Sequence, residues 1–449
     1  MTTACPHVFC RHPEPPPLHT MGAPVRRAIL IGAAALFAIV TSGIAYVAYT
    51  LQRPWHLPAP SGPHAIGVKA LALVDSSRAD PFAGDSALGR ELLVWLWYPA
   101  TPLPGAQPMG YGETVPGALE QLARMLSLPV FAFGRAREVT THTFRDAPVA
   151  AGDSLYPLLL FSHGIGLGTV AQNTVQCEEL ASHGYVVACI GHTHETCMAV
   201  FPDGRAVPAD MARWKEFMRQ ANKSKAPEVL AALNGASTAD QRDSLAREYV
   251  RVSPLLDESN EIWTADTRFV LDAIERRHAM ADSTEVAGRI DVHCVGIFGH
   301  SMGGMAAQKT IMVDPRIAAG ISYDAPPIKE VLTDSIRRPF MFLAAEQYRG
   351  AGEPAFARCA GEAVYAMVRG TTHFNFCDFS LWLRGSPVWR LTGAIGTLDG
   401  YRCETIMNTL TRGFFDCHLR GRSLDPADLR AECPEVELRA KRAGVAVTH

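Results

Sequence analysis

The chain has 449 residues, of which 48% are hydrophobic and 19% are charged, and its net charge at neutral pH is -3. This length and apolar content are enough to bury a large core, which excludes a disordered binding tail as the main part of the protein. The small net charge and the lack of a large cluster of lysine and arginine in the sequence exclude nucleic acid as a partner.

The amino terminus carries a membrane signal. Residues 1–27 are rich in proline and histidine and are expected to form a disordered tail, whereas residues 28–51 are 24 positions without a charge. At about 1.5 Å per residue this segment is long enough to cross a hydrocarbon core of about 30 Å, so we predict a transmembrane anchor. Arg26 and Arg27 favour a cytoplasmic amino terminus and an extracytoplasmic or luminal catalytic domain. The alternative is a cleaved signal sequence, which would give a secreted protein.

The rest of the chain alternates strand-like and helix-like runs. Residues 52–64 are rich in proline and are predicted to be a linker, followed by a catalytic domain at 65–425 and a tail at 426–449. Strand-like runs include residues 92–98, 156–162 and 185–190, and helix-like runs include residues 170–183 and 262–277. This alternation predicts an α/β fold with a mainly parallel sheet and helices on both faces.

A candidate oxyanion loop, residues 163–166, follows the strand predicted at residues 156–162. Its sequence is His-Gly-Ile-Gly, and the glycines let backbone N–H groups turn toward a negatively charged oxygen. We expect the Ile165 amide to be one donor of an oxyanion hole. His163 is expected to brace the loop by hydrogen bonds rather than to transfer protons.

Two histidines farther along, His192 and His194, could suggest a metal. The sequence has no second cluster of ligands at zinc-like spacing, and a loop near a sheet edge is polar in any case. We therefore predict no metal site and no organic cofactor.

A polar, helix-forming insertion at residues 202–259 interrupts the alternation of strands and helices. An insertion above the carboxyl edge of a parallel sheet is where a lid would lie. Met211, Trp214, Phe217 and Met218 recur in it at helical spacing, which favours an ordinary packing stripe over a surface that grips lipid.

The most informative string is residues 295–304, Val-Gly-Ile-Phe-Gly-His-Ser-Met-Gly-Gly. Its first residues are typical of a buried strand, and its glycines remove side chains that would clash where that strand turns sharply into a helix. This strand-turn-helix pattern predicts a nucleophile elbow with Ser301 as the nucleophile. The amide of the following residue, Met302, is then the second donor of the oxyanion hole.

A serine nucleophile needs a histidine that accepts its proton and a carboxylate that orients the histidine. Asp324 directly follows the strand predicted at residues 317–323, and two prolines after it stop that strand. Glu346 follows the next strand, predicted at residues 340–345, and is a second candidate, although the usual order of the triad favours Asp324. His373 lies in the loop after the strand at residues 363–368, where the general base is expected.

Five strings in this order resemble the platelet-activating factor acetylhydrolases, phospholipases that cleave short or oxidised sn-2 acyl groups. The strings are residues 160–166, 180–188, 299–304, 320–325 and 373–379. The resemblance implies an α/β-hydrolase fold and the same roles for the residues chosen above: Ser301 as nucleophile, Asp324 as orienting acid, His373 as base, and Ile165 and Met302 as oxyanion donors. Met302 and the pair Pro326 and Pro327 stand where the family has bulkier residues, so we expect a different acyl pocket.

These observations predict a membrane-tethered serine esterase that hydrolyses short or oxidised sn-2 acyl esters of phospholipids through an acyl-enzyme. Its expected partners are a lipid or small-ester substrate and the membrane, through residues 28–51. A broader carboxylesterase or cutinase-like polyester hydrolase is the alternative enzyme, because Gly-His-Ser-Met-Gly also resembles cutinase-like elbows. The alternative from another class is a catalytically inactive hydrolase fold that only binds, which the complete set of Ser301, Asp324 and His373 argues against.

Overall fold

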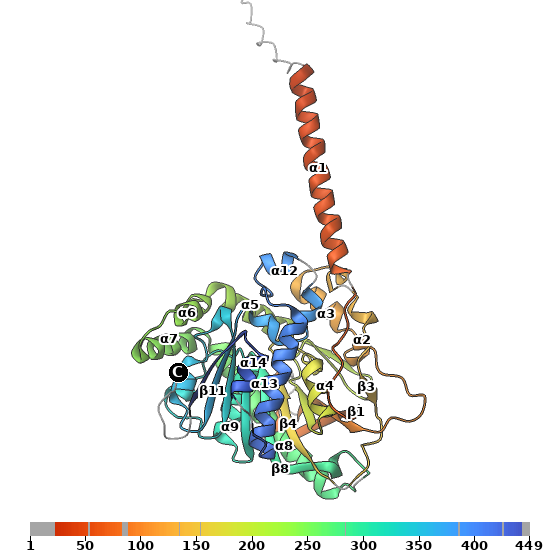
Figure 1. Ribbon diagram of the computed structural model, residues 1–449, viewed down its shortest axis with the longest axis vertical. Helices are drawn as coiled ribbons and strands as arrows, with labels where there is room; N and C mark the ends of the chain where they lie inside the picture. Colours follow the sequence, from red (N-terminus) through yellow and green to blue (C-terminus); the bar gives the residue numbers. More distant parts are fainter. Residues whose placement is uncertain are drawn as a thin grey trace, which may run out of the picture. The chain divides into compact units, whose positions relative to one another are not determined.

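The computed structural model divides the chain into two compact units, Met1–Tyr49 and Thr50–His449 (Figure 1). The described residues are 23–52, 54–82, 89–133, 135–152, 154–282, 284–384, 387–423 and 426–441. Most of the tail expected at residues 1–27 lies outside them.

The first unit contains all but the last two residues of helix α1, Ala23–Leu51, which begins before the predicted boundary at residue 28. Its segment Leu30–Thr50 has a mean hydropathy of 2.1 and is long enough to cross a membrane. Length and composition alone fit both a membrane span and a signal sequence.

The second unit is organised by a ten-stranded sheet with the order β12-β11-β10-β9-β8-β4-β5-β2-β1-β3. Neighbours from β5 to β11 in this order are parallel, whereas β2 and β12 run antiparallel to the strands beside them. The strands of this sheet are β1 (Ala65–Ala79), β2 (Gly89–Ala100), β3 (Thr143–Arg145), β4 (Tyr156–Ser162), β5 (Val186–Gly191), β8 (Ile290–His300), β9 (Ile317–Tyr323), β10 (Phe340–Ala345), β11 (Ala363–Val368) and β12 (Val436–Lys441). A separate hairpin pairs β6 (Met198–Val200) with β7 (Ala206–Pro208).

Helices cover both faces of the sheet, as Figure 1 shows for α9 and α13. The longer helices are α3 (Ala118–Leu126), α4 (Thr174–Ser182), α5 (Met211–Lys223), α6 (Ala226–Leu233), α7 (Ala239–Val252), α8 (Pro254–Met280), α9 (Met302–Val313) and α13 (Gly400–Arg420). Shorter helices are α2 (Tyr111–Thr114), α10 (Glu353–Arg358), α11 (Phe379–Leu383), α12 (Pro387–Leu391) and α14 (Pro426–Glu432). The predicted mainly parallel sheet with helices on both faces is confirmed.

The alternation of side chains along the buried strands creates two hydrophobic layers. In β4, Leu158 and Leu160 pack into a core with residues of α8 and α9, whereas Leu159 and Phe161 pack into a second core with residues of α4 and α13. All four side chains are at most 1% exposed. Because both faces of β4 are buried, its sequence reads as a continuous apolar run rather than an alternating one.

The stretch at residues 202–259 is helical, as the sequence predicts. It contains α5, α6 and α7 and the start of α8. The α5 helix begins at an N-cap, Asp210, whose carboxylate accepts hydrogen bonds from the amides of Ala212 and Arg213. The α7 helix begins with a capping box between Thr238 and Gln241, so local sequence signals define both helix starts.

The predicted carboxyl-terminal boundary at residue 425 is wrong. Residues 426–432 form α14, and β12 pairs with β11 through six residues, from Val436 opposite Val368 to Lys441 opposite Ala363. This strand was not predicted because it is a charged edge strand with only a weak apolar pattern. The last part of the expected tail, residues 442–449, lies outside the described residues.

The proline-rich stretch at residues 52–64 is not a free spacer. Trp55 and Leu57 are 8% and 2% exposed and pack with Tyr111 and Leu122. The Ser61 amide and hydroxyl donate hydrogen bonds of 2.8 and 2.6 Å to the Glu179 carboxylate. The stretch therefore packs as part of the second unit from about Trp55 onward.

We expect the packing of residues 55–61 to contribute to the free energy of unfolding. Protein beginning at residue 54 should keep the unfolding free energy of the catalytic domain, whereas Leu57→Ala in the same protein should lower it by about 2 to 5 kcal/mol, because a buried leucine leaves a cavity. Urea unfolding followed by circular dichroism measures both. If Leu57→Ala unfolds at the same urea concentration as its parent, the stretch does not stabilise the domain.

Candidate active site

Ser301 lies at the sharp turn between β8 and α9. Its backbone has φ 57° and ψ -117°, and its amide donates a 2.9 Å hydrogen bond to the Tyr323 carbonyl in β9. A Cβ atom on Gly299 would lie 2.3 Å from the Gly303 carbonyl oxygen, and one on Gly303 would lie 1.9 Å from the Ser162 carbonyl oxygen. Glycine is therefore required at both positions, and the turn has the geometry of a nucleophile elbow.

Asp324 and His373 are joined by a hydrogen bond of 2.6 Å between Oδ2 and Nδ1. The other carboxylate oxygen accepts a 2.9 Å bond from the Ala345 amide. Because the carboxylate accepts at Nδ1, the second ring nitrogen of His373 is left as a proton acceptor. Of the two carboxylate candidates, the structure thus brings Asp324 to the histidine. Glu346 instead accepts a 2.7 Å bond from the Gly370 amide, in the loop that leads to His373.

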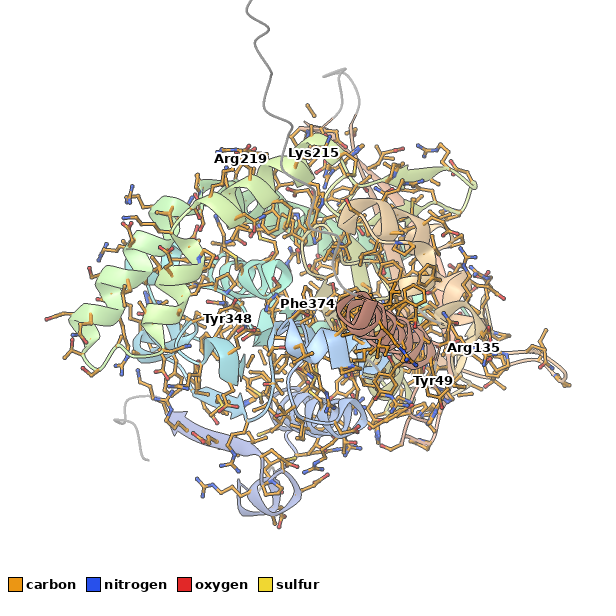
Figure 2. The ribbon with its side chains drawn as sticks, turned by 90° about the horizontal axis from the view of Figure 1, so that it is seen from above. Tyr49, Arg135, Lys215, Arg219, Tyr348 and Phe374 are labelled. Carbon is orange, nitrogen blue, oxygen red and sulfur yellow. The ribbon has the colours of Figure 1, made fainter. Side chains whose placement is uncertain are left out.

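Ser301 and His373 line the same cavity, which has a volume of about 360 Å³. Most of its wall is apolar. Trp214, Phe217 and Met218 contribute from α5, and further apolar residues come from three other segments: Leu126, Phe133, Phe374, Phe379, Trp382 and Trp389. Figure 2 shows Phe374 near the middle of the face that is viewed from above. The shape and lining suit a hydrophobic substrate.

The loop after β4 offers a backbone donor to this cavity. The Gly164 amide donates to Gln172 Oε1 at 2.8 Å, and the Gly166 amide donates to the Glu195 carbonyl at 2.7 Å. Within the described chain the Ile165 amide between them has no hydrogen-bond partner, and neither has the Met302 amide at the start of α9. Both predicted oxyanion donors are therefore available to a ligand.

His163 braces this loop, as predicted. Its Nδ1 donates to the Gly164 carbonyl at 2.8 Å, and its Nε2 accepts from the His192 amide at 3.4 Å. Burial lowers the pKa of His163 to about 3, so the ring is neutral at physiological pH.

A chain of side-chain hydrogen bonds connects the three loops of the site. Gln172 Nε2 lies 2.8 Å from His300 Nδ1, and His300 Nε2 lies 3.0 Å from the His373 carbonyl oxygen. The Gly164 amide can only donate and the His373 carbonyl can only accept, so every proton in the chain has one possible position. Gln172 donates to His300, and His300 donates to His373. Burial holds the pKa of His300 well below its usual range, which keeps this ring neutral.

The His192 ring is held by hydrogen bonds to neighbouring side chains. Its Nδ1 lies 3.0 Å from Asp266 Oδ2 and its Nε2 lies 3.0 Å from the Ser162 hydroxyl, so both ring nitrogens are already bonded. The ring stacks on Trp263 with a centroid distance of 3.9 Å. Asp266 is also paired with the buried Arg90 at 2.9 Å. His192 thus belongs to a buried network beneath the site.

Sequence reasoning missed Gln172, His300 and Asp378 as supports of the site. Asp378 is buried five residues after His373 and accepts hydrogen bonds from the Thr174 amide at 3.0 Å and the Tyr111 hydroxyl at 2.8 Å. It thereby joins the histidine loop to the start of α4. For His300, its place inside the elbow was a usable signal, and Asp378 lies in the family-like string at residues 373–379. Gln172 had no such signal, because it lies outside the five strings and its partner His300 comes from a distant segment.

The family model described as platelet-activating factor acetylhydrolase, isoform II, matches residues 50–428. This chain belongs to that family. Platelet-activating factor acetylhydrolase of Cavia porcellus is 25% identical over 283 residues, and that of Gallus gallus is 22% identical over 387 residues. These alignments cover 61% and 82% of this chain, and 60% and 85% of the relatives.

Two further proteins are similar to this member of the family. A protein of Arthroderma benhamiae named probable 1-alkyl-2-acetylglycerophosphocholine esterase is 25% identical over 308 residues, which are 66% of this chain and 65% of the relative. The solved structure of ferulic acid esterase from Streptomyces cinnamoneus superimposes with a TM-score of 0.62 at 26% identity, covering 86% of this chain and 99% of that structure. The matches to the relatives from Cavia porcellus and Canis lupus familiaris span 60% and 62% of the length of those proteins.

The hydrogen-bonded chain through Gln172 predicts a specific kinetic defect. Gln172→Leu keeps the side-chain volume but releases both the Gly164 amide and the His300 ring, so we expect kcat on a short ester to fall by about 10 to 100-fold through misplacement of the reacting groups. KM should change little, because the wall of the cavity keeps its shape.

Gln308→Leu is the matched control. Gln308 is 1% exposed in α9 and lies outside this hydrogen-bonded chain. The control should keep its kcat. Equal losses of kcat in the two variants would show that the Gln172 defect is a general effect of removing a buried amide.

Proposed function

We propose that this protein is a serine esterase that hydrolyses short or oxidised sn-2 acyl esters of phospholipids. The observation that carries the proposal is the 2.6 Å bond between Asp324 and His373 beside Ser301, in an apolar cavity that both Ser301 and His373 line. Membership of the platelet-activating factor acetylhydrolase family supports the substrate class.

In the first half of the reaction, the Ser301 hydroxyl attacks the ester carbonyl while His373 Nε2 takes its proton. Asp324 stabilises the imidazolium through the bond at Nδ1 and keeps the ring in the tautomer that can accept at Nε2. The carbonyl oxygen becomes an oxyanion, which the amides of Ile165 and Met302 stabilise. His373 then gives the proton to the leaving alcohol, and an acyl-enzyme on Ser301 remains.

In the second half, water attacks the acyl-enzyme. His373 removes a proton from the water, the same two amides stabilise the second oxyanion, and the proton returns to Ser301 as the carboxylic acid leaves. Each step uses only residues of this chain, and the proposal requires neither a metal nor a cofactor.

The apolar wall explains why a lipid ester would bind. A cavity of about 360 Å³ has room for a short acyl group and part of the glycerol. Met302 is 1% exposed and packs in the core with residues of α8 and β4. Neither Met302 nor the pair Pro326 and Pro327 is among the described residues that line this cavity, so these positions do not carry the expected difference in the acyl pocket.

We further propose that α1 tethers the enzyme to a membrane, with the catalytic domain on the extracytoplasmic or luminal side. Arg26 and Arg27 precede the apolar segment and Arg53 alone follows it closely. This asymmetry of basic residues favours a cytoplasmic amino terminus.

The triad assignment predicts unequal effects of two similar substitutions. Asp324→Asn should lower kcat by about 10⁴-fold, because the amide favours the wrong tautomer of His373. Glu346→Gln should change kcat little, since the amide oxygen can still accept from Gly370. Initial rates on a short sn-2 phospholipid measure both, with Ser301→Ala as the variant that a fluorophosphonate probe no longer labels. Equal losses in the two carboxylate variants would remove Asp324 from its proposed role.

The substrate class is tested with phospholipids whose sn-2 acyl group grows from two to sixteen carbons, compared with simple esters of the same acids. We expect the highest kcat/KM on short-chain phospholipids, because the cavity has room for a short acyl group. Brisk hydrolysis of simple esters without phospholipid turnover would instead identify a general carboxylesterase.

A further inference from the structure

A second cavity lies next to the catalytic one, within the helical insertion. It has a volume of about 130 Å³ and is lined by residues of α5, α6, α7 and α8 and by Tyr348. Of the residues described as lining the two cavities, Phe217 is the one that lines both. Phe217 therefore borders both cavities.

The helix that carries Phe217 has two distinct sides. Lys215 and Arg219 lie on its outer side, as Figure 2 shows, and are exposed. Trp214 and Met218 line the catalytic cavity with Phe217. The Phe217 ring stacks on Trp214 with a centroid distance of 5.5 Å and an interplanar angle of 28°, and it is half-buried. One side of this ring is thus left for contact with a ligand.

The lining of the second cavity defines what it can hold. None of its described lining residues carries a charge, and most are aliphatic or aromatic, including Leu230, Val252, Leu255 and Leu256. Such a space holds hydrocarbon favourably and offers little to a charged group.

We propose that the second cavity is a subsite for the distal carbons of an aliphatic chain of the ester substrate, and that Phe217 sets the length of chain that the enzyme accepts. This inference rests on the esterase function proposed above, because it takes Ser301 as the fixed point from which the chain extends. The chain can belong to the acyl group or to the alcohol, and the experiment distinguishes the two.

The physical consequence is a shift in chain-length preference. With the Phe217 ring in place, carbons beyond the catalytic cavity have no apolar space to enter. Removing the ring joins the cavities, and each further methylene that becomes buried should then raise kcat/KM by about fourfold until the second cavity is full. Several carbons can be accommodated in this way.

The test compares full-length wild type with Phe217→Ala on two series of esters. The first series is p-nitrophenyl esters with acyl chains of two to sixteen carbons, and the second is acetate esters of alcohols with the same range. We expect the chain length of maximal kcat/KM to move to longer chains in one series, which identifies the chain that enters the subsite. Phe217→Trp should move it to shorter chains.

Matched variants separate this role from ordinary packing of the insertion. Met211→Ala removes a half-buried side chain of the same helix that is not among the described residues lining either cavity, so it should not move the maximum. Ala221→Phe fills the second cavity from α5, so in the Phe217→Ala background it should return the maximum to shorter chains. If Phe217→Ala does not fold, Phe217→Leu opens the same wall to a smaller extent.

Two results would overturn the inference. If Phe217→Ala and Phe217→Leu lower kcat/KM equally at all chain lengths in both series, Phe217 is a packing residue and the second cavity is not a subsite. If wild type hydrolyses no ester in either series, the proposed esterase function fails, and this inference fails with it. Activity of wild type on short esters without a shift in the variants rejects the subsite alone.

Discussion

The backbone conformation of Ser301 is the constraint on which the rest of the site depends. A serine at φ 57° costs about 1 to 3 kcal/mol and persists only where surrounding contacts determine it. Those contacts are the bond from its amide to Tyr323 in the next strand and the bond of 3.1 Å from the Gly303 amide to the His163 carbonyl. The second bond is possible because Gly303 has no side chain where it meets β4. The same close approach that turns the strand into a helix therefore also places the oxyanion loop against the nucleophile.

Side chains extend this constraint to the histidine loop. The series of hydrogen bonds begins at the Gly164 amide, which can only donate, and ends at the His373 carbonyl, which can only accept. The donor and acceptor of each bond between them are therefore fixed, and none of the groups needs to be charged. A charged bridge at this depth would need a buried counter-ion, and a buried unpaired charge is costly. Gln172 and His300 make this connection as neutral side chains, and the low pKa of His300 keeps its ring neutral beside His373. The positions of Ser301, of the loop that carries the Ile165 amide and of His373 are thus coupled.

The elements predicted best from the sequence are those whose local pattern alone decides their structure. The strands β4, β9, β10 and β11 have the predicted bounds, since each is a short apolar run that polar or turn-forming residues end on both sides. The strands β1 and β12 were missed because both mix charged and apolar residues. β12 is an edge strand, and β1 is flanked on its outer side only by the three residues of β3. The residues of the proposed triad follow the ends of predicted strands and could be chosen in advance. The destinations of the Gln172 and Asp378 side chains are set by tertiary packing, which no local pattern encodes.

The insertion packs directly against residues 163–166, because Gly166 has no side chain to keep the Trp214 ring away. Gly166 has φ 74°, and a Cβ atom there would lie 2.4 Å from the Trp214 ring, so the first turns of α5 rest directly on the loop that carries the Ile165 amide. The Trp214 indole also donates a 3.4 Å bond to the Met125 carbonyl, which joins the insertion to α3. These contacts place α5 beside the Ile165 amide, and hydrogen bonds to a developing oxyanion are stronger where water is excluded. Because Trp214 and Phe217 lie one helical turn apart on α5, the contact that orders the oxyanion loop also fixes the far wall of the cavity. The position of the loop that carries the Ile165 amide and the shape of the cavity are therefore set by the same helix.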